Sequence, residues 1–173
     1  MSATAFPLHQ LRDLPFESFK EKLFDQWYPH TYEVLKKLEL QAALLSENYS
    51  LEGFDTYIKK ISNEFDNLYS KEKLVLYPFL AKLGHENKRA ENCSPFKNVK
   101  VHHTAMLNAA QSAADYLQNI FANDNNIEQI ATVNTLLQDF IATAEELQWI
   151  KDSGYYIRFK NCAGCGTPKA NLA

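Results

Sequence analysis

The sequence predicts an all-α protein, an up-down-up-down antiparallel four-helix bundle. Two observations lead to this fold class. Four long segments carry apolar residues at alternating spacings of three and four, which place these residues on one face of a helix. Mostly short polar breaks separate the segments, and no alternating strand pattern competes with them. We therefore expect four amphipathic helices around one core.

The first helix is expected from about Pro15 to Ser46, with Asp13 as its cap. Within it, Pro29 lacks a backbone donor and clashes with the preceding turn, so we expect a kink or a helix restart just before His30. The residues predicted to face inward are Phe16, Leu23, Trp27, His30, Val34, Leu38 and Leu45.

The second helix follows the polar break Glu47-Asn48-Tyr49-Ser50, and Gly84 is expected to end it. Its apolar face contains one acidic residue, Glu72. The residues predicted to face inward are Phe54, Ile58, Ile61, Phe65, Leu68, Glu72, Val75 and Phe79. The charged segment from His85 to Asn98 is expected to be the longest loop.

The third helix is expected to end near Ala122, and its inward face is predicted to be Val99, His103, Met106, Ala110, Ala113, Leu117 and Ile120. A buried His103 needs a hydrogen-bond partner or a metal, because an unpaired polar group in a core costs roughly 1–3 kcal/mol. The fourth helix is expected from Ile127 to about Asp152, where Ser153-Gly154 would stop it. Its predicted inward residues are Ile130, Val133, Leu137, Phe140, Ala144 and Leu147. The bundle would thus span residues 1–153, with a C-terminal tail over 154–173.

Composition sets limits on the possible partners and on the compartment. A chain of 173 residues that is 46% hydrophobic and 23% charged fits one soluble domain. The net charge of −3 comes from intermixed acids and bases, so we expect neither nucleic acid nor a membrane as a partner. The N-terminus lacks the pattern of a signal peptide, and an odd number of cysteines agrees with a reducing compartment. We therefore expect a cytoplasmic protein.

Equal distances from the connecting turns would bring His30, Glu72, His103 and Glu145 to one level of the bundle. Imidazole and carboxylate groups together suit iron, manganese or zinc, so these four residues are the candidate metal ligands. The alternative is a buried His–Glu hydrogen-bond network without metal. The sequence contains no nucleophile–base motif and no phosphate-binding loop, so neither a catalytic nor a cofactor site is indicated.

These residues give the chain a resemblance to the hemerythrin-like (HHE cation-binding) bundles, nearest to the di-iron proteins that repair iron–sulfur centres. The resemblance extends from about Pro7 to Ile150. It is carried by Leu11-Arg12-Asp13-Leu14-Pro15 through Trp27-Tyr28-Pro29-His30, by Lys71-Glu72-Lys73-Leu74-Val75-Leu76-Tyr77-Pro78-Phe79-Leu80, and by His102-His103, which stands where the family commonly has Glu-His. It implies non-haem iron and a function in oxygen, nitric-oxide or iron-stress handling.

The chain departs from the family pattern at two further histidines, whose places are taken by Leu68 and by Phe140 or Ile141. Two hypotheses follow. Either a reduced site holds mono- or dinuclear iron or another divalent metal, with a diatomic molecule or a metal ion as the ligand. Or the bundle has lost its metal and is a sensory or protein-interaction module, with a protein partner or a second copy of the chain.

A second candidate site is the pair Cys162-Ala163-Gly164-Cys165 in the tail. With Cys93 or a histidine it could contribute to a zinc site, and with neighbouring lysines it could be redox-active. An incidental pair, or an intersubunit metal or disulfide, is the alternative.

Overall fold

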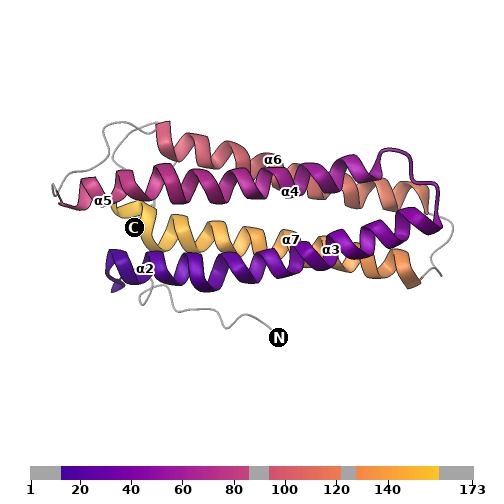
Figure 1. Cartoon of the computed structure of the whole chain (residues 1–173), viewed down its shortest axis with the longest axis horizontal. Coiled ribbons are helices and arrows are strands. Elements are labelled where there is room, and N and C mark those ends of the chain that lie inside the picture. The colour runs from indigo at the N-terminus through magenta and orange to yellow at the C-terminus, as the bar shows by residue number, and fades with distance from the viewer. Residues whose placement is uncertain (1–12, 86–93, 122–127, 160–173) are drawn as a thin grey trace, which may run out of the picture.

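The computed structural model describes residues 13–85, 94–121 and 128–159, and within these ranges the chain is helical and contains no strand. The helices form long rods that lie side by side along one axis (Figure 1). The sequence prediction of an all-helical bundle-like protein is therefore confirmed. No helix in the described ranges is both long and apolar enough to cross a membrane.

The rods are interrupted by short π-helical segments, labelled η1, η2 and η3. The first rod consists of α2 (Phe16–Lys22), η1 (Leu23–Trp27) and α3 (Tyr28–Asn48). The second consists of α4 (Phe54–Lys71), η2 (Glu72–Leu76) and α5 (Tyr77–His85). The third is α6 (Ser94–Ile120), and the fourth consists of α7 (Glu128–Trp149), η3 (Ile150–Tyr155) and the 3₁₀ turn η4 (Tyr156–Arg158).

Proline explains two of the π-helical segments. Pro29 and Pro78 are each the second residue of a Tyr-Pro pair that follows η1 and η2. A proline ring clashes with the carbonyl four residues earlier, which here lies inside the preceding π-helical segment. A π turn holds one extra residue and widens the helix at that point. The expected restart before His30 is thus confirmed, because α3 begins at Tyr28.

The π turns shift the inward face by one residue in both rods, so part of the predicted face is wrong. His30 is exposed and Thr31 is buried, and likewise Val75 is 46% exposed whereas Leu76 is buried. The continuous 3.6-residue period that placed His30 and Val75 inward does not hold across an extra residue. Thr31 is tolerated in the core because its hydroxyl donates a hydrogen bond to the Trp27 carbonyl, at 3.2 Å.

Two predicted helix ends also differ. The third helix begins at Ser94, with Pro95 in its first turn, rather than after a loop that extends to Asn98. Ser153-Gly154 does not stop the fourth rod, because helical backbone continues through η3 and η4. Between α3 and α4, the turn depends on Gly53, whose φ of 83° lies in the left-handed region that favours glycine.

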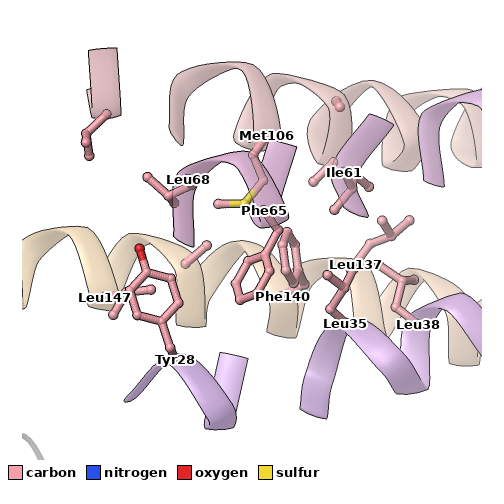
Figure 2. Packing of buried hydrophobic residues seen from close by; sticks show 14 of the residues in the cluster. Tyr28, Leu35, Leu38, Ile61, Phe65, Leu68, Met106, Leu137, Phe140 and Leu147 are labelled. Atoms are coloured by element: carbon pink, nitrogen blue, oxygen red, sulfur yellow. The ribbon is translucent and has the colours of Figure 1, made fainter. Parts of the chain in front are cut away.

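The core fills the space between the rods with large side chains (Figure 2). α6 packs against both α4 and α7, and α3 packs against α7 and α4. The predicted inward faces of α4, α6 and α7 are largely buried, although Ile120 is 49% exposed at the end of α6. Core residues shown in Figure 2 include Leu35, Leu38, Ile61, Phe65, Leu68, Met106, Leu137 and Phe140.

The shift caused by η1 can be tested with two neighbouring substitutions. Thr31→Asp should lower the free energy of unfolding by about 3 kcal/mol or more, because it buries an unpaired carboxylate. His30→Asp should change it by less than about 1 kcal/mol, since this position is exposed. Urea denaturation measures both. A larger loss for His30→Asp would mean that the helix continues without the extra residue.

Candidate functional site: a buried polar cluster

One fully buried tyrosine follows each π-helical segment directly. In each case the tyrosine amide donates a hydrogen bond to the carbonyl five residues earlier: Tyr28 to Leu23, Tyr77 to Glu72 and Tyr156 to Lys151. All three tyrosines are at most 2% exposed. The extra residue in each π turn therefore rotates a large polar side chain toward the core. π turns of this kind occur frequently at functional sites.

The centre of the cluster is an ion pair between Lys151 of η3 and Glu72 of η2. The Lys151 Nζ atom lies 2.7 Å from Glu72 Oε1, and both side chains are 0% exposed. The ammonium also lies 5.5 Å from the centre of the Tyr28 ring, within the range of a cation–π interaction. A fully buried lysine is rare in proteins unless it is paired, so this charge depends on its two partners.

Tyr28 and Tyr156 lie close to this pair, and Tyr77 lies next to Tyr156. Figure 2 shows that Tyr28 extends from its helix into the core with its hydroxyl innermost. Burial, followed by the charge of the Glu72 carboxylate, raises the pKa of Tyr28 well above its ordinary value. The same two causes raise the pKa of Tyr156, whose ring centre lies 6.4 Å from that of Tyr77. The hydroxyls of Tyr28 and Tyr156 therefore stay protonated and neutral near pH 7.

His103 lies close enough to this cluster for the charge of Lys151 to change its pKa. Burial, and then the positive charge of Lys151, lower the pKa of His103 to about 4. The ring is thus neutral at pH 7, and its Nε2–H donates a hydrogen bond to the Ala144 carbonyl, at 3.1 Å. The prediction that His103 points inward and needs a polar partner is confirmed, and that partner is a backbone carbonyl of the adjacent helix.

The structure does not bring the four predicted metal ligands together. His30 and Glu145 are exposed, Glu72 is paired with Lys151, and His103 is bonded to Ala144. Across residues 13–85, 94–121 and 128–159, no three His, Cys, Asp or Glu side chains form a group that could hold a metal. As folded, these residues do not fit the iron centre that the family resemblance implies. Metal binding itself stays a prediction.

The other candidates lie apart from this cluster. Cys93, Cys162 and Cys165 fall outside the described residues. His102 pairs with Glu64 of α4 through an Nδ1–Oε2 distance of 2.7 Å, and both side chains are partly exposed. His102 therefore lies on a flank of the bundle, outside the buried cluster.

Sequence reasoning missed Lys151, although a signal for it was present. The inward positions Val133, Leu137, Phe140, Ala144 and Leu147 continue at the same spacing to Lys151, so this lysine lies on the core face. The sequence also marks two of the tyrosines, since each of the first two rods contains a Tyr-Pro pair, Tyr28-Pro29 and Tyr77-Pro78. Their inward direction depends on the π turns, which the apolar period does not show.

Two surface pockets, each of about 330 Å³, lie on the outer side of the tyrosines. Phe24 lines both of them. Tyr77 forms part of the wall of one, between α2 and α5, and Tyr28 forms part of the wall of the other, between α3 and α4. These two tyrosines therefore separate the buried ion pair from space that a small molecule could enter.

Comparison with protein-family models, with curated proteins and with solved structures finds no match to this chain. The fold and the cluster define an all-helical protein with a buried charged centre, and the function has to be argued from that centre.

The energetics of the ion pair can be tested by a double-mutant cycle. Lys151→Met should lower the free energy of unfolding by about 3–5 kcal/mol, because it leaves the Glu72 carboxylate buried without its counter-charge. Replacing both partners, with Glu72→Leu added, should recover most of this loss. Lys20→Met removes an exposed partner of Glu17 and should cost less than about 1 kcal/mol. Equal losses for the single and double variants would show that the two charges are not coupled.

His103 predicts a pH dependence of stability. Its pKa is about 4 in the folded protein and 6.5 ordinarily, so the unfolded chain binds the proton more readily. The stability linked to His103 is therefore complete above pH 6.5 and is lost as the pH falls toward 4, by roughly 3 kcal/mol in total. His103→Gln keeps a donor for Ala144 and should flatten the slope measured by denaturation between these pH values. His30→Gln, on the exposed surface, should leave the slope unchanged, and a wild-type slope in His103→Gln would contradict this assignment.

Proposed function

We propose that this chain is a hemerythrin-like bundle of up-down-up-down topology in which a lysine–glutamate ion pair takes the place of the metal centre, and that it is a metal-free sensory module. The observation that carries the proposal is the Lys151 ammonium at 2.7 Å from Glu72 in a fully buried site. An ammonium there supplies the positive charge that a metal ion would otherwise supply to the carboxylate.

Electrostatics supports the replacement of the metal. A divalent ion bound to Glu72 Oε1 would lie within about 5 Å of the ammonium, since that oxygen is 2.7 Å from Nζ and metal–oxygen bonds are about 2 Å long. At that distance the divalent ion and the singly charged Lys151 ammonium repel each other by roughly 7 kcal/mol, at an effective dielectric constant of about 20. Binding by His103 would further require loss of its hydrogen bond to Ala144. The charges and contacts of the cluster thus oppose a metal at this carboxylate.

The sensory part of the proposal is supported by the position of the two pockets. Tyr28 and Tyr77 line the pockets, and the charge of Glu72 acts on Tyr28 directly. A ligand in either pocket would contact a side chain whose opposite end lies in the buried cluster. Such a ligand would therefore change the packing around the ion pair, and a partner protein could detect that change.

Elemental analysis of untagged protein tests the proposal, combined with absorption spectra after anaerobic addition of iron and exposure to air. We expect far less than one metal ion per chain and no absorption band from iron. Lys151→Met serves as the matched variant, because it removes the ammonium while Glu72 and His103 remain.

Three other outcomes would count against a metal-free bundle. Stoichiometric iron that is lost in His103→Ala, with the fold intact, would favour an iron protein of oxygen, nitric-oxide or iron-stress handling. Iron that is lost in His30→Ala as well would restore the four-residue site. Zinc that is lost only when Cys162 and Cys165 are replaced would move the chemistry to the tail.

A further inference from the structure

The pocket between α3 and α4 is lined mainly by aromatic side chains. Its volume is about 330 Å³, near the lower end of the range for small-molecule sites. Pro29 and one carboxylate, Asp66, also line it, and its aromatic residues are Phe24, Tyr28, Tyr32, Phe65 and Tyr69. No lysine or arginine lines this pocket.

The rings of the pocket face in different directions. The Tyr69 ring stands at 86° to Phe24 and at 82° to Tyr28, and the Tyr28 ring stands at 70° to Phe65. Because the face of an aromatic ring carries the negative end of its quadrupole, a lining of five rings favours a cation over an anion. This arrangement suits a rounded cation.

The chain's own lysines show that these rings attract cations. Lys36 Nζ lies 4.9 Å from the centre of Tyr32, and Lys73 Nζ lies 5.1 Å from the centre of Tyr69. Lys73 Nζ also lies 5.9 Å from the centre of Phe24, and Lys151 contacts a fourth ring of the lining, Tyr28, from the core. The charge of Lys36 is balanced by Glu39 at 2.7 Å. Asp66 has no salt bridge to any described residue, so its charge remains available to a ligand.

We propose that this pocket binds a small molecule that carries a quaternary ammonium group. Such a group has no N–H donors to satisfy, and it gains from aromatic faces and one nearby carboxylate, which are the features of known sites for quaternary ammonium ligands. This inference names the ligand class of the proposed sensory function and rests on that function for its biological purpose. The contacts that it requires do not depend on the absence of metal.

Calorimetric titration of the full chain with choline tests the proposal, and 3,3-dimethylbutan-1-ol is the neutral control of the same shape. We expect saturable binding of choline at least about fivefold tighter than that of the alcohol, since cation–π contacts favour the charged ligand. Equal affinity for both, or no saturable binding of choline, would overturn the proposal.

Two variants with matched controls locate the site. Tyr32→Leu and Asp66→Asn change exposed residues and should each weaken choline binding about fivefold. Tyr57→Leu and Asp139→Asn change a tyrosine and an exposed aspartate that do not line the pocket, and they should leave the affinity unchanged. Equal weakening by the controls would place the ligand elsewhere and overturn the assignment.

The same protein sample separates this inference from the proposed function. Absence of choline binding in metal-free protein would refute the ligand class and leave the metal-free bundle standing. Stoichiometric iron would refute the metal-free bundle, whatever the choline result. A trimethyllysine peptide that binds more tightly than choline would overturn the assignment to a small molecule in favour of a peptide ligand.

Discussion

The buried ion pair between Lys151 and Glu72 is the interaction on which the rest of the structure depends. Two charges without exposure to water are tolerated only if they meet each other at close range. The second and fourth rods therefore have to be aligned so that η2 and η3 lie at the same level. An apolar core alone tolerates sliding by a helical turn, whereas a pair of charges at 2.7 Å does not. The pair thus specifies the relative position of two rods that belong to opposite halves of the chain.

The π turns make room for this pair and build its surroundings. Each adds one residue before a buried tyrosine, so a phenol ring points to the centre of the bundle where a regular helix would place a different side chain. Proline supplies the local reason in two rods. In the fourth rod, the π-helical segment η3 contains Gly154, a residue with poor helix propensity. The π-helical segments and the polar cluster therefore have the same origin in the sequence.

The sequence predicted the fold class and much of the core, because three of the four rods keep a regular apolar period over most of their length. It also identified Glu72 and His103 as polar groups on buried faces. Their partners were not predictable in the same way. His30 was placed inward by a period that the π turn at η1 breaks, and Lys151 lay one step beyond the apolar face that ended at Leu147. Partners of buried charges depend on the register between rods, which a one-dimensional pattern does not contain.

Tyr28 connects the cluster to the surface, because its ring takes part in both. It contributes to the wall of the pocket between α3 and α4, and the Lys151 ammonium lies 5.5 Å from its centre. The ring quadrupole is shared between cations that approach it, so a cation in the pocket and the ammonium in the core act on the same electron density. The ammonium has one further strong partner, Glu72, at 2.7 Å. Under our proposal, a ligand that engaged Tyr28 would therefore shift the balance of the ion pair toward Glu72, and through it the contact between the second and fourth rods. This would be a physical route from the surface pocket to the buried centre of the bundle.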